Sequence, residues 1–117
     1  MLFRSGVGLN LTTKGMKWFW DQYLQKKSDY KNPYAVPFAA KDYRGLAPAI
    51  VITAEYDPLL DDGYNYAQLL KRDGVTTIYY EYPGMIHGFF SLAAVTPTAI
   101  EAQSRLADEI KIGRAHV

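Results

Sequence analysis

The sequence predicts an α/β fold in which parallel strands alternate with helices. Three observations predict it: an apolar, β-branched run at 49–56, an amphipathic segment at 59–74 and a second β-rich run at 76–82. Strand, helix and strand in this order form a βαβ unit, whose strands are parallel and whose crossover is right-handed. A parallel sheet of only two strands leaves both of its faces and both of its edges exposed unless other segments bury them. We therefore expect the chain to be the trailing part of a larger α/β domain.

The segment ahead of this unit predicts one helix and then an ordered loop. Residues 12–27 carry apolar side chains at spacings of three and four, with Thr12 or Thr13 as the N-cap and two lysines at the end. Residues 28–48 hold three of the six prolines and no sustained periodicity, which is typical of a loop. The helix stripe, which faces either a core or a ligand, consists of Met16, Phe19, Trp20, Tyr23 and Leu24. The side chains expected to anchor the loop are Tyr30, Tyr34, Phe38 and Tyr43.

The βαβ unit itself is predicted from its boundaries and its charges. The strand at 49–56 lies between Pro48 and Pro58 and is apolar enough to be buried on both faces. The helix at 59–74 has acidic residues at its positive N-terminus, basic residues at its negative end and a glycine as its C-cap. These residues are Asp61, Asp62, Lys71, Arg72 and Gly74.

A last helix is expected to begin at Pro97, with Thr98 and Glu101 as a capping box. Its packing stripe would be Ala99, Ala102, Leu106 and Ile110. The final residues, "IGRAHV" at 112–117, match one reading frame of a sequencing adapter, so we expect a non-native tail that includes His116 and a gene that is incomplete. The predicted organisation is a cap-like or lid-like helix and loop at 1–45, a core portion at 46–111 and this tail.

Composition excludes several classes of function. With 13 Lys and Arg against 12 Asp and Glu, the balanced charge gives no reason to expect nucleic acid as a partner. Cysteine is absent and only two histidines occur, so disulfides, thiolate chemistry and a metal site are not expected, and no cofactor is implied. No apolar run has transmembrane length, and the first residues lack a signal-peptide core. If the source is bacterial, a cytoplasmic location is favoured, although an incomplete N-terminus would weaken that expectation.

Two titratable residues follow the two predicted strands. Asp57 comes directly after the first strand, and His87 lies 30 residues later, in the loop after the second. Parallel strands place both at the same edge of the sheet, where open α/β sheets bind ligands. An Asp that holds the Nδ1–H of a His fixes the ring tautomer and stabilises the imidazolium that forms when Nε2 accepts a proton. The apolar neighbours of His87 would exclude water from such a pair.

A structural interpretation of the same residues stays open at this point. A single His in an apolar stretch is often a hydrogen-bonded core residue, and an Asp before Pro often only makes a turn. Spacing alone does not decide between a catalytic pair and these structural roles.

Longer motifs add a family resemblance. "GLAPAIVITAEYDPLLDDGYNYAQLLKRDGV" and "YPGMIHGFF" resemble the end of the hormone-sensitive-lipase branch of the α/β-hydrolases, which includes the bacterial family IV carboxylesterases. "LTTKGMKWFWDQYL" and "NPYAVPFAAKDYRGLAP" resemble the segment that closes over the active site in that family. The most specific parts are "EYDPLLDDG" and "MIHGF", and one departure is Leu60, where relatives often carry Arg.

The resemblance implies a fold and roles for individual residues. It implies the C-terminal part of an α/β-hydrolase fold, with Asp57 as the acid and His87 as the general base of a Ser-His-Asp triad. Substrate-binding positions would be Met16, Trp20, Ile86 and Phe89. The substrate would be a small acyl ester of short to medium chain length, with no cofactor. The oligomeric state stays open.

The same resemblance shows what the chain lacks. Neither the G-x-S-x-G nucleophile motif nor an HGGG-type oxyanion loop occurs in the sequence, and "SGVG" at 5–8 does not fit the former. We therefore expect the chain alone to be inactive. A ligand-binding, receptor-like protein of the same fold is the alternative, against which the presence of His87 argues. An unrelated doubly wound binding domain would leave "MIHGF" unexplained.

Overall fold

The computed structural model describes residues 10–115 of the chain. These residues form two compact units, divided between His87 and Gly88. The first unit contains α1 (Thr13–Tyr23), β1 (Ala49–Tyr56), α2 (Leu60–Arg72) and β2 (Thr77–Ile86), and the second contains α3 (Pro97–Ala115). Among the described residues, no helix is both long and apolar enough to cross a membrane.

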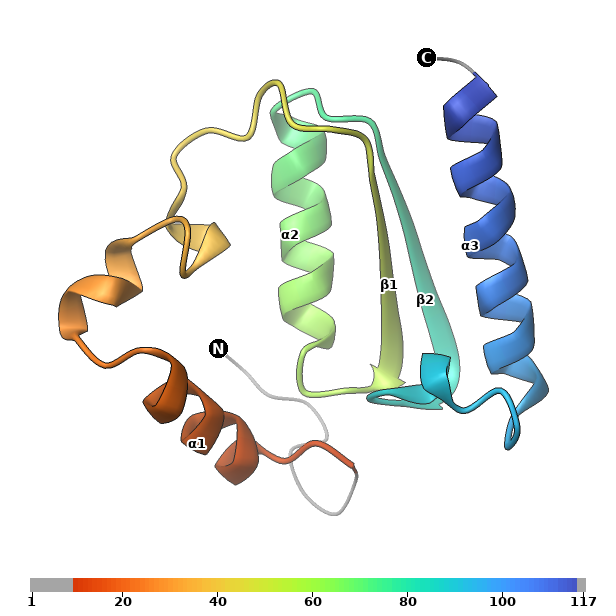
Figure 1. The fold of residues 1–117 in the computed structure, drawn as a ribbon, viewed down its shortest axis with the longest axis horizontal. Coiled ribbons are helices and arrows are strands. Elements are labelled where there is room, and N and C mark those ends of the chain that lie inside the picture. The colour runs from red at the N-terminus through yellow and green to blue at the C-terminus, as the bar shows by residue number, and fades with distance from the viewer. Residues whose placement is uncertain (1–9, 116–117) are drawn as a thin grey trace. The chain divides into compact units, whose positions relative to one another are not determined.

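The βαβ unit predicted from the sequence is confirmed. β1 has the predicted bounds and pairs in parallel with β2, and the two arrowheads lie at the same end of the sheet (Figure 1). α2 begins with Asp61 and Asp62 in its first turn and ends with Lys71 and Arg72, as the helix dipole favours. Gly74, the residue after the C-cap of α2, has φ 79°, the left-handed conformation that commonly ends a helix.

The second strand is longer than predicted, and the first is less buried. β2 continues to Ile86 instead of ending at residue 82, because Tyr56 pairs with Ile86 after a shift of register. Pro83 and Gly84 indicate a strand end, yet the ladder resumes beyond them. Only Thr53 and Ala54 of β1 are buried, because the described residues supply one neighbouring strand and one covering helix, α2.

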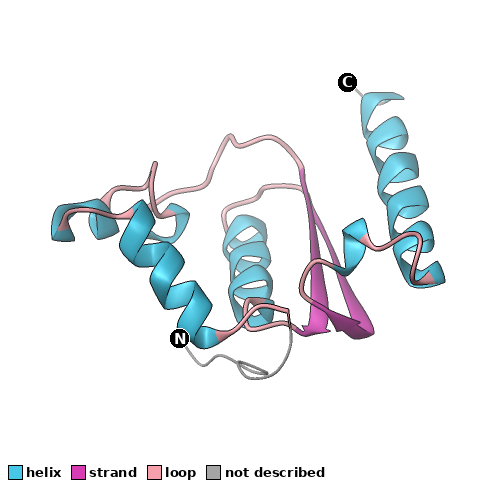
Figure 2. Cartoon of the chain, turned by 60° about the horizontal axis from the view of Figure 1, so that its bottom comes forward, coloured by secondary structure: helices cyan, strands magenta, loops and turns pink. Residues whose placement is uncertain are grey.

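Close contact between α2 and β1 depends on a glycine. A Cβ atom on Gly63 would lie 2.5 Å from Cγ2 of Thr53 and 3.8 Å from Cγ1 of Val51. α2 therefore lies against the strand at a distance that no side chain at this position permits. The Oγ1 of Thr53 is in turn hydrogen-bonded to the hydroxyl of Tyr79 on β2, at 2.8 Å. Helix and sheet form two layers (Figure 2).

The predicted first helix is real but shorter. Thr12 is its N-cap, accepting the N–H of Gly15 at 3.1 Å, and the helix ends at Tyr23 instead of residue 27. The chain then enters a short 3₁₀ helix, η1 (Lys27–Lys31), so the two lysines do not lie at the end of α1. Of the predicted stripe, only Met16 and Leu24 are buried, whereas Phe19 and Tyr23 are exposed.

The loop that follows contains a second 3₁₀ helix, η2 (Pro37–Ala39), and one strong anchor. Tyr43 is 3% exposed, its hydroxyl donates to the carbonyl of Pro37 at 2.9 Å, and its N–H donates to Asp73 at the end of α2. Tyr43 forms a small core with Leu70 and Val75. Tyr34, by contrast, is 96% exposed, so its prediction as an anchor is wrong.

The second unit consists of the 3₁₀ helix η3 (Phe89–Ser91) and α3. α3 begins at Pro97 as predicted, but its first-turn N–H groups are accepted by the side chain and carbonyl of Thr96, not by a box centred on Thr98. Ala99 and Ala102 are fully buried, whereas Ile110 is exposed. The helix runs on to Ala115, through the first four residues of the predicted non-native tail, and residues 116–117 lie outside the described range.

Candidate active site

The structure brings Asp57 and His87 together at the carboxyl edge of the sheet. Nδ1 of His87 lies 2.8 Å from Oδ2 of Asp57, which is hydrogen-bonding distance. The Asp57 side chain is 11% exposed and the His87 side chain 37%. The described residues therefore bury the carboxylate but leave the imidazole partly open, so the water-free setting expected from the apolar neighbours of His87 is not reached.

The two oxygens of Asp57 do different things. Oδ1 accepts the N–H of Leu59 at 2.8 Å, and the carbonyl of Asp57 accepts the N–H of Leu60. These are the bonds of a turn that leads from β1 into α2, with Pro58 fully buried inside it. Oδ2 remains available for His87. One carboxylate thus makes a hydrogen bond of the turn and also contacts His87, and the turn holds it in a fixed direction.

His87 is held through its backbone as well as its ring. The side-chain amide of Asn10 donates to the carbonyl of His87 at 3.0 Å, and β2 ends at the residue before it. Because Nδ1 is engaged by Asp57, Nε2 is the nitrogen through which the ring can exchange a proton with another group. A general base that is oriented by a carboxylate needs this geometry.

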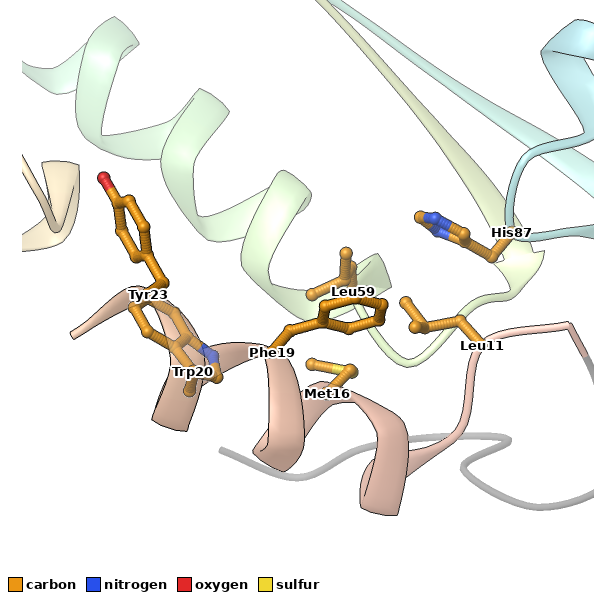
Figure 3. Close-up of a pocket in the computed structure, with 7 residues that line it drawn as sticks. All are labelled: Leu11, Met16, Phe19, Trp20, Tyr23, Leu59 and His87. Carbon is orange, nitrogen blue, oxygen red and sulfur yellow. The ribbon is translucent and has the colours of Figure 1, made fainter. Parts of the chain in front are cut away.

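An apolar cavity of about 370 Å³ lies beside the imidazole. Figure 3 shows the His87 ring at one end, with Leu11, Leu59 and side chains of α1 lining the rest. The walls are Leu11, Met16, Phe19, Trp20, Tyr23 and Leu59. A volume of this size suits a small organic ligand. Among the described residues of the wall, the imidazole is the one ionisable group besides the phenol of Tyr23.

Two of the four predicted substrate-binding residues line this cavity, namely Met16 and Trp20. Ile86 instead pairs with Tyr56 in the sheet and is half-buried. Phe89 belongs to the second unit, where it is 4% exposed, so its contact with a substrate stays a prediction.

Four other wall residues were not among the predicted substrate-binding positions, although the helix stripe as a whole was left open to face a core or a ligand. Phe19 and Tyr23 lay on the predicted helix stripe, and their spacing of four was the available signal. Leu59 was missed because it is the first residue of the predicted helix at 59–74, and no ligand-facing side was predicted for that helix. Leu11 was missed because it precedes the helix and reaches the cavity only through the fold.

Stacked aromatic rings hold one wall of the cavity. The Trp20 ring stacks on Tyr30 of η1, with centroids 6.1 Å apart and an interplanar angle of 26°, and it also contacts Tyr23. Such pairs restrict the orientation of both rings. Tyr30, which the sequence predicts only as a loop anchor, therefore sets the position of a cavity wall.

A larger groove of about 780 Å³ shares Trp20, Leu59 and His87 with this cavity. It runs along β1 and α2 and includes Thr53, Asp62 and Tyr66. Burial raises the pKa of the Asp62 carboxyl above its usual value, and the nearby Asp61 adds to this effect.

Known proteins match this chain along most of its length. A family described by its alpha/beta hydrolase fold matches residues 4–91. Carboxylesterase NlhH of Mycobacterium tuberculosis is 48% identical over 64 residues, which are 55% of this chain and 20% of that protein. Ethyl acetate hydrolase of Pseudomonas putida is 33% identical over 98 residues, which are 84% of this chain and 31% of that protein.

A solved structure gives the same result in three dimensions. An esterase from Pyrobaculum calidifontis superposes with a TM-score of 0.82 at 47% identity, over 87% of this chain and 33% of that one. The chain thus spans between a fifth and a third of the length of these relatives. The resemblance to the hormone-sensitive-lipase branch is confirmed by these esterases, and the chain belongs to the α/β-hydrolase fold family.

Proposed function

We propose that this chain supplies the acid and the base of a serine carboxylesterase, with Asp57 orienting His87. The observation that carries the proposal is the 2.8 Å contact between His87 Nδ1 and Asp57 Oδ2, next to an apolar cavity. The names of the relatives, a carboxylesterase and an ethyl acetate hydrolase, support the reaction class.

In this proposal His87 moves one proton twice. Nε2 takes the proton from a serine hydroxyl while the serine oxygen attacks the ester carbonyl. Asp57 stabilises the imidazolium that forms. The imidazolium then gives the proton to the departing alkoxide, which leaves as an alcohol. Water hydrolyses the acyl-serine by the same two proton transfers in a second cycle.

The nucleophile would come from residues outside this sequence. No G-x-S-x-G motif and no HGGG-type loop occurs among the 117 residues. A general base without its nucleophile and oxyanion donors has no covalent step to catalyse. We therefore propose that the 117-residue chain alone does not turn over esters.

The cavity supports a substrate with a small apolar group. Its wall offers aliphatic and aromatic surface and few polar atoms, so burying a charged group there would carry a desolvation cost without a partner. A volume of about 370 Å³ fits a short or medium acyl chain better than a long one. We propose short- to medium-chain acyl esters as the substrate class.

The test uses protein expressed from the longest open reading frame that contains this chain. His87→Ala should lower kcat on p-nitrophenyl butyrate by about 10⁴-fold to 10⁶-fold, since the base and its partners act as a unit. Tyr34→Ala is the matched control, because this side chain is 96% exposed and lies outside the cavity. Unchanged activity of His87→Ala would refute the proposal. Ester binding without turnover by the unsubstituted protein would favour the receptor-like alternative.

A further inference from the structure

The end of β2 is irregular directly before the imidazole. Ala54 pairs with Tyr82 and Tyr56 pairs with Ile86, so one residue of β1 faces three residues of β2. The single residue on β1 is Glu55, and the three on β2 are 83–85. Two extra residues of β2 must therefore be accommodated immediately before His87. A bulge of this kind redirects the chain and the side chain that follows it.

A hydrogen bond from the bulge to Glu55 spans this irregularity. Proline at position 83 has no N–H to donate, and Gly84 has φ 74°, a left-handed conformation that disfavours other residues. The N–H of Gly84 donates to Oε2 of Glu55 at 2.7 Å, which is short, as expected for a carboxylate acceptor. A Cβ at Gly84 would meet nothing within 4 Å, so glycine is required there for the backbone conformation and not for space.

We propose that Glu55 is a positioning residue for the imidazole of His87. Gly84 lies three residues before His87, and Glu55 lies two residues before Asp57, so the Glu55–Gly84 bond joins the same two strand ends that carry the Asp57–His87 pair. The bond holds the bulge in one conformation, and it thereby fixes the position of the His87 backbone at the end of β2. Its catalytic consequence rests on the proposed function.

The side chain of Glu55 does not line either cavity beside His87. Its loss should therefore leave the affinity for substrate almost unchanged. Misplacing the base by a fraction of an ångström to one ångström should instead lower kcat, by about 10-fold to 100-fold. A general loss of folded protein would also lower the apparent kcat at unchanged KM. The rates are therefore referred to the folded fraction seen by NMR, and the Nδ1 signal of His87 in that fraction reports the positioning role.

The experiment compares three variants in protein from the longest open reading frame that contains this chain. Glu55→Ala removes the acceptor, Glu55→Gln keeps a neutral acceptor of the same shape, and Glu81→Ala removes a carboxylate from the neighbouring strand without touching Gly84. With ¹⁵N-labelled glycine and histidine, NMR reports the hydrogen exchange of the Gly84 amide and the Nδ1 proton of His87. The same samples are assayed for kcat and KM on p-nitrophenyl butyrate.

We expect Glu55→Ala to speed exchange of the Gly84 amide about threefold to tenfold, to weaken the His87 Nδ1 proton signal and to lower kcat with KM unchanged. Glu55→Gln should restore most of kcat, and Glu81→Ala should match the unsubstituted protein. An unchanged Nδ1 signal and an unchanged kcat in Glu55→Ala would overturn the proposal. If Glu55→Ala does not fold, Glu55→Gln decides: its weaker acceptor should still speed Gly84 exchange, and unaltered exchange would overturn the inference.

The two proposals can fail separately. If the unsubstituted protein hydrolyses no ester, the proposed function is refuted. The NMR comparison still decides whether Glu55 positions His87, because neither signal depends on turnover.

Discussion

Gly63→Ala should destabilise the protein, although alanine favours a helix over glycine. Gly63 lies in the first half of α2 and faces β1. In an unhindered helix the substitution would stabilise by about 1 kcal/mol. Here the new Cβ would lie 2.5 Å from Thr53 Cγ2, whereas carbon atoms in ordinary contact are about 3.5–4.0 Å apart. α2 must move away from β1 by about 1 Å, or Thr53 must change rotamer.

The size of this destabilisation follows from the contacts of Thr53 with Tyr79 and with α2. Rotating its side chain away would break the 2.8 Å bond between Oγ1 and the hydroxyl of Tyr79, at a cost of about 1 kcal/mol. Moving the helix is overpacking, which costs about 1–3 kcal/mol. After subtracting the helix-propensity gain of about 1 kcal/mol, we expect a net loss of up to about 2 kcal/mol in the free energy of unfolding.

Urea unfolding followed by circular dichroism measures this loss as a lower midpoint at constant slope. Thr53→Ser is the informative partner, because it removes Cγ2 and keeps Oγ1. The double variant should recover most of the stability lost in Gly63→Ala, giving a coupling free energy of about 1–2 kcal/mol in a double-mutant cycle. A stabilised Gly63→Ala variant, or a coupling near zero, would refute the packing argument.

Three further predictions follow from the contacts of the first unit. Tyr30→Ala should loosen Trp20 and raise KM for p-nitrophenyl butyrate a few-fold, whereas Tyr30→Phe keeps the stacked ring and should not; equal KM values would contradict the stacking role. Tyr43→Phe removes the hydroxyl bond to the η2 backbone and should lower the unfolding free energy by about 1 kcal/mol in urea melts, and an unaltered midpoint would argue against it. Hydrogen bonds from the Arg72 guanidinium, which has the larger effect, and from the Tyr43 N–H hold the pKa of Asp73 below its usual value. The stabilisation of the fold by this carboxylate is therefore present above its unfolded pKa, and it is lost as pH falls through the lower folded value. Asp73→Asn should therefore flatten the decline of the urea midpoint below about pH 4, and an equally steep decline in the variant would count against this assignment.

The βαβ unit was predictable because its signals are local. A β-branched run between prolines, and a helix with acidic residues at one end and basic residues at the other, each indicate one element within a few residues. The rule that parallel strands meet at one edge then brings Asp57 and His87 to the same place, and the 2.8 Å contact agrees with it. The irregular extension of β2 was not predictable, since a proline and a glycine in succession indicate an end to a strand and only pairing with Tyr56 restores it.

By itself, the sequence determined the order of strand and helix in the core, the position of Asp57 and His87 at the strand ends, and the presence of an aromatic helix before them. The tertiary structure decided which side chains of that helix line a cavity with Leu59 and His87, which loop aromatic is buried and which is exposed, and how Glu55 reaches Gly84. The physical reason is the distance along the chain over which each interaction acts. Periodicity and capping act over a few residues along the chain, whereas a cavity wall or a bond across a bulge depends on distances between segments about 30 or more residues apart.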